Sequence, residues 1–359
     1  MPVIRGHDVQ EAAHWLAQGR LVAFPTETVY GLGANARDEA AIAAVYQAKG
    51  RPGDHPVIVH VTGVDAALAW TTTLNEQAER LMAHFWPGPL TLILPRRADV
   101  SLRITGGQET VAVRCPAHPM AQQLLQAFEQ IYGPGAGVIA PSANRFGQVS
   151  PTHADHVYDE FADLPHPSIY LLDGAAAQVG IESTIVDVSA PDTGVRILRP
   201  GHIQASDIER VLGEPVQQRA PTAAAQTAPT HPPIPRVSGS LKAHYAPRTP
   251  LYLFERDDLP TLLKENNNQS VAIVSCGELN EHSDNDTKHT AQTSQPAARQ
   301  LIHYEAMPAE PNPYASQLYA TLRRLDRRGF DALWFERPPQ DLAWAGVNDR
   351  LSRAAAAFS

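Results

Sequence analysis

Apolar and polar residues follow two spacings along residues 1–214. Short apolar runs bounded by polar, Gly or Pro positions predict strands, and apolar residues three to four positions apart predict helices. The predicted strands are Leu21–Phe24, Val57–Val61, Leu90–Leu94, Thr110–Arg114, Val138–Ala140, Ile169–Leu172, Ser183–Asp187 and Val195–Leu198. The predicted helices are Glu39–Lys49, Asn75–Phe85, Pro119–Gln130, His153–Glu160 and one after Ser206. Because several strands follow one another without an intervening helix, we expect an α/β domain with a mixed sheet.

Residues 248–359 alternate more strictly between strand and helix. The expected order is strand Leu251–Phe254, helix Leu259–Glu265, strand Val271–Ser275, helix Tyr314–Arg328, strand Ala332–Phe335 and helix Asn348–Ala357. Such alternation predicts a small parallel sheet.

A proline-rich segment separates the two patterns. Six prolines lie between residues 215 and 235, and prolines at this density disfavour both helix and sheet. We therefore predict a first domain over residues 1–212, a linker over 213–247 and a second domain over 248–359. The polar stretch from Glu278 to Gln300 predicts a long loop inside the second domain.

Composition limits the class of protein. Of the 359 residues, 43% are hydrophobic and 19% charged, which is enough for large cores. Two cysteines exclude a disulfide framework and a cysteine-based zinc site. The apolar runs are far shorter than the roughly 18 residues that span a bilayer, and the first residues lack the apolar stretch of a signal peptide. We expect a cytoplasmic enzyme without a membrane contact.

Positive charge is scarce in the first part of the chain and lies at predicted strand ends. The net charge is −9, and Lys49 is the single lysine of residues 1–214. Lys49 and Arg51 share a Gly/Pro loop, which suits an anionic phosphate, although a solvated surface loop is the alternative. Arg114 ends an apolar strand and needs an anionic partner, either a structural carboxylate or a substrate. Arg199 ends another strand.

Small polar residues accompany these cations. Thr26, Glu27 and Thr28 follow the strand Leu21–Phe24, and Gly31 and Gly33 come after them. This pattern suits either a ligand site at a strand end or a turn that needs glycines for its backbone. Ser142, Asn144 and Ser150 lie in a loop after another strand, and either phosphate contact or an Asx/Ser turn explains them. His60 ends a strand, where histidine is more often structural than catalytic.

Together these stretches predict one cleft that gathers the positive charge of an acidic domain. The cationic residues are Lys49, Arg51, Arg114, Arg145 and Arg199. Such a cleft suits a polyphosphate and a carboxylate substrate. The sequence lacks a Walker A pattern, H-E-x-x-H and G-x-S-x-G, so an activated side-chain nucleophile is not expected.

At these residues the sequence resembles the YrdC-like family, in its long form, the L-threonylcarbamoyladenylate synthases with a C-terminal domain. The matching motifs occur in order over residues 8–210: P-T-E-T-x-Y-G-L, K-x-R-P, W-P-G-P-L-T, V-R-x-P, A-P-S-A-N, E-S-T and R-P-G. The long form adds H-Y-A-P, matched by His244–Pro247, and a Rossmann-like domain matched by residues 249–359. One departure is His55, where the family often has Asn.

The resemblance implies a fold and an activity. The fold would be a YrdC-like mixed twisted sheet with flanking helices, followed by a linker and a small Rossmann-like α/β domain. The enzyme, a nucleotidyltransferase, would condense L-threonine, bicarbonate and ATP to threonylcarbamoyl-AMP and pyrophosphate, for N6-threonylcarbamoyladenosine in tRNA. Mg²⁺ would arrive with the ATP phosphates, without metal-binding residues of its own. Downstream threonylcarbamoyl-transfer proteins would be partners, together with a weak tRNA contact.

The resemblance also implies roles for individual residues. Threonine-binding residues would be Thr28, His60, Arg114, Ala140 and Ser183, with Arg114 at the carboxylate. ATP-binding residues would be Arg51, His55, Thr110, Ser142, Ser150, Arg199 and, from the linker, Tyr245. Lys49 and Arg51 would supply the catalytic positive charge at the phosphates.

Two other functions stay open at this point. The first is a module that binds double-stranded RNA, against which the net charge of −9 weighs. The second is a carbamoyl-transfer enzyme of the hydrogenase-maturation type, whose zinc-finger cysteines are absent here. Arg323, Arg324, Arg327 and Arg328 share one face of a predicted helix, for which a solvated face is favoured over an RNA or partner surface.

Overall fold

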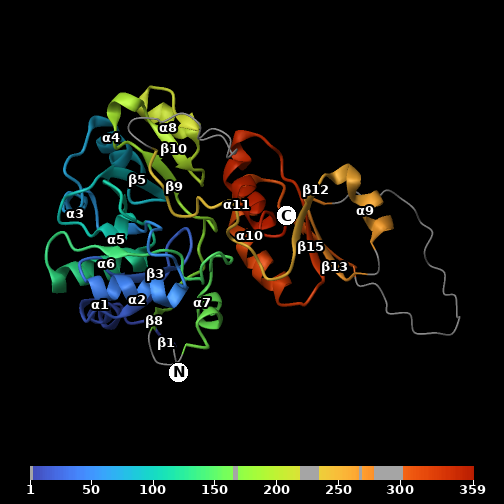
Figure 1. The fold of residues 1–359 in the computed structure, drawn as a ribbon, viewed down its shortest axis with the longest axis horizontal. Helices are drawn as coiled ribbons and strands as arrows, with labels where there is room; N and C mark the ends of the chain where they lie inside the picture. The colour runs from blue at the N-terminus through green and yellow to red at the C-terminus, as the bar shows by residue number, and fades with distance from the viewer. Residues whose placement is uncertain (1–2, 165–168, 219–233, 267–268, 279–301) are drawn as a thin grey trace, which may run out of the picture.

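The computed structural model describes residues 3–164, 169–218, 234–266, 269–278 and 302–359. Two lobes lie side by side, the first built by the N-terminal part of the chain and the second by the C-terminal part (Figure 1). Much of the predicted linker, and nearly all of the polar stretch after Glu278, lies outside the described residues. The domain limits therefore stay predictions. No helix in the described ranges is both long and apolar enough to cross a membrane.

The first lobe contains an eleven-stranded mixed sheet in the order β1-β8-β2-β3-β7-β4-β6-β5-β9-β10-β11. Its strands are β1 Val3–Gly6, β2 Leu21–Phe24, β3 Gly31–Asn35, β4 Ile58–His60, β5 Leu90–Pro95, β6 Thr110–Arg114, β7 Val138–Ile139, β8 Ile169–Leu172, β9 Thr184–Asp187, β10 Arg196–Arg199 and β11 Gln217–Gln218. Parallel β4·β6 and antiparallel β5·β6 pairs stand next to each other. The expected mixed sheet is confirmed.

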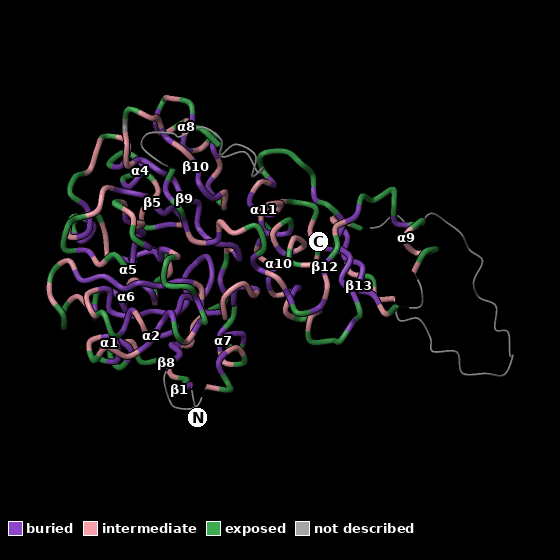
Figure 2. Tube along the Cα trace, in the orientation of Figure 1, coloured by how far each residue is buried: buried purple, intermediate pink, exposed green. Residues whose placement is uncertain are grey.

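Helices cover this sheet on both faces. They are α1 Val9–Ala17, α2 Glu39–Lys49, α3 Val64–Ala67, α4 Glu76–Phe85, α5 Leu102–Thr105, α6 Pro119–Tyr132, α7 Ala154–Glu160 and α8 Ala205–Leu212. Along β6, Val111 and Val113 join one core cluster while Ala112 packs against another, as the alternation predicts. Figure 2 shows the strands of both lobes as largely buried.

The two glycines after Thr28 lie in a strand, not in a turn, which was one of the two interpretations that the sequence left open. Gly31 and Gly33 belong to β3, which pairs antiparallel with β2. A Cβ on Gly33 would come within 2.8 Å of the Phe24 ring, and one on Gly31 within 3.0 Å of the Ala140 Cβ. The glycines are therefore needed for close approach across the sheet.

The second lobe has a four-stranded sheet in the order β12-β15-β13-β14, with every pair parallel. Its strands are β12 Leu251–Phe254, β13 Val271–Cys276, β14 Ile302–Met307 and β15 Ala332–Glu336, and its helices are α9 Leu259–Glu265, α10 Pro311–Asp326 and α11 Ala345–Ala355. The predicted parallel sheet is confirmed. Strand β14 was not expected, because it directly follows the long polar stretch and has an alternating, half-exposed pattern.

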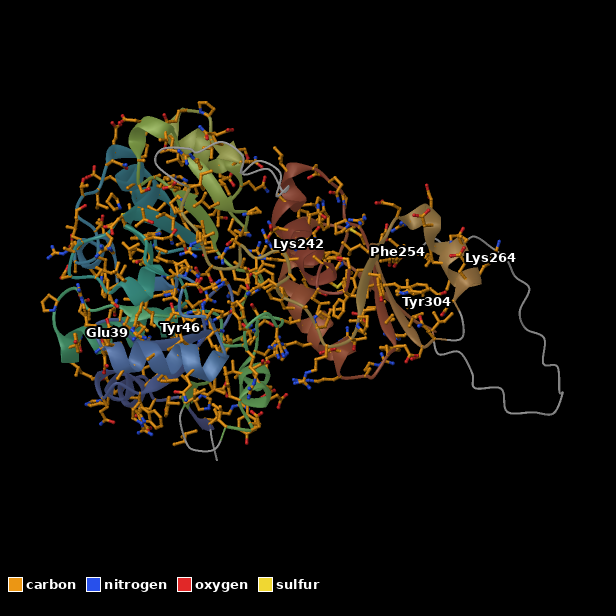
Figure 3. The ribbon with its side chains drawn as sticks, in the orientation of Figure 1. Glu39, Tyr46, Lys242, Phe254, Lys264 and Tyr304 are labelled. Atoms are coloured by element: carbon orange, nitrogen blue, oxygen red, sulfur yellow. The ribbon has the colours of Figure 1, made fainter. Side chains whose placement is uncertain are left out.

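The expected solvated face is confirmed for Arg324, Arg327 and Arg328, which are exposed, but not for Arg323, whose side chain is largely buried. Arg323 bridges to Glu160 of α7 at 2.8 Å, and Arg327 bridges to Asp159 at 2.5 Å. Arg324 pairs with Glu305 inside the second lobe. The lobes are thus joined by ion pairs, and side chains fill the junction beside the linker residue Lys242 (Figure 3).

These two bridges differ in burial, which yields a first prediction. The side chains of Arg323 and Glu160 are 11% and 6% exposed, whereas those of Arg327 and Asp159 are 53% and 52% exposed. Glu160→Gln leaves a buried guanidinium without its counter-charge and should lower the free energy of unfolding by roughly 3–5 kcal/mol. The matched Asp159→Asn should cost at most about 1 kcal/mol. Urea unfolding of the full chain measures both, and equal losses would contradict the buried bridge.

Candidate functional site

One cavity lies where several strands of the large sheet end and the linker crosses them. His60 ends β4, Arg114 ends β6 and Arg199 ends β10, while Ser183 directly precedes β9. Most of the residues that the sequence predicts for the site line this cavity: Thr28, Lys49, Arg51, His60, Arg114, Ala140, Ser142, Ser183, Arg199 and Tyr245. The structure therefore brings together segments from residue 28 to residue 245.

Three predicted site residues do not line the cavity. His55 packs edge-on against Phe146, whose ring forms part of the cavity wall. Thr110 lines a small neighbouring cavity that shares Ile58 with the main one. Ser150 is fully buried behind the wall and donates its hydroxyl hydrogen to Glu182 at 2.5 Å.

The sequence predicted that five cationic residues would gather in one cleft, and four of them line the cavity. Arg145 does not line the cavity; its guanidinium pairs with Asp163 at 2.5 Å, and its backbone N–H bonds to Glu160. The loop after β7 thus directs Arg145 toward the carboxylates of the following helix and turn. Lys49, Arg51, Arg114 and Arg199 remain in the cavity wall.

Local structure explains how Lys49 and Arg51 reach the cavity. Asp38 caps the first turn of α2, and Gly50 ends the helix in the left-handed conformation with φ 61°. Lys49, the last residue of the helix, donates to the backbone carbonyls of Ser142 and Asn144. The lysine therefore holds the loop after β7 against the helix end.

Three cations of the wall are buried close to one another. Burial lowers the pKa of Lys49 well below its usual value, and neighbouring Arg51 lowers it further. Burial also lowers the pKa of Arg51 and of Arg199. Because buried like charges oppose one another, an anion in the cavity would stabilise all three.

The linker contacts both arginines of this group. Arg51 donates to the Ser238 hydroxyl at 3.3 Å, and Arg199 donates to the Ser238 carbonyl at 3.1 Å. Tyr245, buried with φ 62°, stacks against Tyr319 of α10. Its hydroxyl has no hydrogen-bond partner among the described residues. The linker thus forms the outer wall of the cavity.

The anionic partner of Arg114, for which the sequence left two possibilities, is a structural carboxylate, that of Glu27. The Arg114 guanidinium donates to Glu27 at 2.6 Å and to the Thr28 hydroxyl at 2.9 Å. Thr26 shapes this loop, since its hydroxyl oxygen accepts from the backbone N–H groups of Thr28 and Val29. Glu27 therefore fixes the orientation of Arg114 at the cavity wall.

His60 is a neutral base on this side of the cavity. Burial, with nearby Arg114, lowers its pKa to about 3. Its Nδ1 is buried without a hydrogen-bond partner in the described part of the chain. His60 can therefore exchange a hydrogen bond with a bound molecule without carrying charge at neutral pH.

Glu182 lines the cavity, and the sequence marked it only as the first residue of the E-S-T motif, without a role. Burial alone would raise the pKa of its carboxyl, but the charges of Arg350 and Arg199 and the bond from Ser150 outweigh burial and lower it to about 2. Both arginines are distant in sequence, so no local pattern around Glu182 indicated this environment. In the described residues no group of three His, Cys, Asp or Glu lies close enough to hold a metal ion.

Comparisons with known proteins agree with this arrangement. Residues 14–201 match the family model described as "Telomere recombination", and residues 203–356 match "Threonylcarbamoyl-AMP synthase, C-terminal domain". The threonylcarbamoyl-AMP synthase of Pyrococcus abyssi is 33% identical over 96% of this chain and 93% of its own length. That of Bacillus subtilis is 42% identical over 69% of this chain and 66% of its own length. A solved structure of P. abyssi Sua5 complexed with L-threonine has a TM-score of 0.79 and 32% identity, covering 99% of this chain and 98% of that one.

Buried cations line the cavity of this α/β fold, and two of them, Arg114 and Arg199, stand at strand ends. Such a site is typical of enzymes that bind anionic substrates and act by orienting them. Within that class, the chain belongs to the YrdC-like family in its long form, the threonylcarbamoyl-AMP synthases with a C-terminal domain.

The burial of Arg51 yields a second prediction. Arg51→Ala removes charge-assisted hydrogen bonds and should weaken ATP binding by about 10- to 150-fold. Arg51→Lys should lose much of the affinity too, because a point charge does not replace a planar fork. Arg145→Ala is the matched control outside the cavity. Calorimetric titration with ATP measures all three, and normal ATP affinity in Arg51→Ala would exclude this role.

Proposed function

We propose that this chain condenses L-threonine, bicarbonate and ATP to threonylcarbamoyl-AMP and pyrophosphate. The observation that carries the proposal is the burial of Lys49, Arg51 and Arg199 around one cavity that Arg114, Thr28 and His60 also line. Three buried cations suit the triphosphate, and the anchored Arg114 suits a carboxylate. Threonine and ATP are accordingly the two substrates assigned to the cavity.

The nucleophile arises from substrate. The amine of threonine attacks bicarbonate, and loss of water gives the carbamate. One carbamate oxygen then attacks the α-phosphorus of ATP while the bond to the bridging oxygen of pyrophosphate breaks. Arg51, Arg199 and Lys49 balance the charge that develops on the phosphates, so orientation and electrostatics supply the rate enhancement.

The threonine side of the cavity is assigned to Thr28, His60, Arg114, Ala140 and Ser183. Arg114 binds the carboxylate with the N–H groups of its guanidinium that Glu27, Thr28 and the Gly88 carbonyl leave free. Neutral His60 accepts or donates a hydrogen bond without adding charge beside Arg114. Val29 and Ala140, both in the cavity wall, offer an apolar surface for the methyl group.

The nucleotide side is assigned to Arg51, Ser142, Arg199 and the linker residue Tyr245, with His55, Thr110 and Ser150 behind or beside the wall. Mg²⁺ enters as part of the ATP substrate, held chiefly by phosphate oxygens. Asn144 fits this ion, because its Oδ1 is buried in the cavity region without a partner among the described residues. Tyr245 closes over the nucleotide and excludes water from the reactive anhydride.

The product is consumed by proteins that transfer the threonylcarbamoyl group to adenosine in tRNA, and a weak contact of this chain with tRNA accompanies the transfer. The alternative of a double-stranded RNA module is not favoured, because Arg323, Arg324 and Arg327 pair with carboxylates of the same chain.

The absence of an enzyme-derived nucleophile gives a third prediction. Pyrophosphate release should require ATP, threonine and bicarbonate together, since omission of either threonine or bicarbonate removes the attacking group. A pyrophosphate assay in carbon-dioxide-free buffer, with bicarbonate restored as the control, measures this dependence. Equal turnover without bicarbonate would show that the chain catalyses another reaction.

The apolar wall formed by Val29 and Ala140 gives a fourth prediction. Threonine should be preferred over serine by about 10- to 200-fold in kcat/KM, because one buried methyl group is worth about that discrimination. The same assay with threonine, serine or alanine as the amino acid measures the preference. Equal kcat/KM for threonine and serine would mean that the methyl group does not lie in an apolar pocket.

A further inference from the structure

Glu182 connects the cavity to the second lobe. Its carboxylate lines the cavity and accepts hydrogen bonds from the Tyr319 hydroxyl at 3.0 Å and from Arg350 Nε at 2.8 Å. Tyr319 lies on α10 and Arg350 on α11, so both donors come from the C-terminal lobe. The remaining carboxylate oxygen accepts from Ser150. One wall residue of the cavity is thus held by both lobes.

Arg350 also joins two backbone segments of the first lobe. Its side chain is 0% exposed, and it donates to the carbonyl of Glu182 at 3.2 Å and to that of Pro200 at 2.8 Å. Ser183 and Arg199 are the adjacent residues on those two segments. Arg199 in turn donates to the Ser183 carbonyl at 2.9 Å. The guanidinium of Arg350 therefore fixes the spacing of the residues assigned to the nucleotide and threonine.

The C-terminal lobe packs tightly against the first lobe at this contact. A Cβ on Gly346 of α11 would lie 3.1 Å from the Gly201 carbonyl oxygen and 2.9 Å from Ile181. A Cβ on Gly180 would lie 2.4 Å from the Ala315 carbonyl oxygen on α10. Backbone of the C-terminal lobe thus packs directly on both sides of the Glu182 and Arg199 segments.

We propose that Tyr319 and Arg350 of the C-terminal lobe are positioning residues for the nucleotide side of the active site. They act through Glu182 and Ser150 and through the segments that carry Ser183 and Arg199, without touching substrate. The C-terminal lobe then completes the ATP site. The inference rests on the assignment of that site in the proposed function.

The test compares two buried tyrosines on α10. Tyr319→Phe removes the hydroxyl that bonds to Glu182 and keeps the ring. Tyr314→Phe is the matched control, because Tyr314 is equally buried but its hydroxyl has no partner among the described residues. The dissociation constants of a non-hydrolysable ATP analogue and of L-threonine are measured by calorimetry on the full chain, together with the Tm of each variant.

We expect Tyr319→Phe to weaken binding of the ATP analogue by about 10-fold, the lower range for a hydrogen bond to a charged group. Threonine affinity should fall less than the affinity for the analogue, because Ser183 is the one threonine-side residue adjacent to Glu182. The Tm should fall as well, because the buried Glu182 carboxylate loses one of its donors. Tyr314→Phe should leave both affinities unchanged and should not lower the Tm, because the hydroxyl it removes has no partner among the described residues. Arg350→Lys keeps the charge but cannot reach both carbonyls and the carboxylate, and it should weaken binding of the analogue at least as much as Tyr319→Phe.

Two results would overturn the inference. One is an analogue affinity within twofold of wild type in Tyr319→Phe. The other is a loss of threonine affinity as large as the loss of affinity for the ATP analogue, which indicates a general distortion of the cavity. Turnover of the wild-type chain tests the proposed function separately: an inactive wild type refutes the synthase, whereas an active wild type with an unaffected Tyr319→Phe refutes only this positioning role.

Discussion

A carboxylate buried between two lobes, that of Glu182, constrains how the site can be built. An ionised carboxyl group away from water is tolerable only when donors surround it. Here one donor comes from the loop after β7, through Ser150, and two come from the C-terminal lobe, through Tyr319 and Arg350. The strand ends that carry Ser183 and Arg199 are next to this group. The arrangement of the cavity therefore depends on the docking of the second lobe, which the bridge between Arg323 and Glu160 reinforces.

Charge in the cavity is divided between its two sides. Glu27 holds Arg114 on one side, and Glu182 faces the group formed by Arg51, Lys49 and Arg199 on the other. Burial is the main cause that lowers the pKa of Lys49, Arg51 and Arg199, and the charge of Glu182 opposes that shift at Lys49 and Arg199. In the proposed function these cations bind the triphosphate. In the proposed mechanism, orientation of ATP and of the threonine carboxylate is the main contribution of the protein to catalysis.

The sequence predicted the features that depend on local pattern. The periodicity of residues 39–49 and the apolar run of residues 21–24 determine α2 and β2, and the parallel second sheet follows from strict alternation. It missed β3, because two glycines that permit close packing across a sheet resemble those of a turn. It also missed the pairing of Arg323 with Glu160 and of Glu182 with Arg350, since tertiary partners more than 160 residues apart leave no local signal. Arg145 was misplaced because the carboxylates that bind it, those of Glu160 and Asp163, lie outside the cavity.

The most direct measurement is a crystal structure of the full chain with L-threonine and a non-hydrolysable ATP analogue. The account predicts the triphosphate against Arg51 and Arg199, where Ser238 now bonds, and the threonine carboxylate at Arg114. It also predicts that Glu182 keeps its bonds to Tyr319 and Arg350. A nucleotide whose phosphates contact neither Arg51 nor Arg199 would contradict the account.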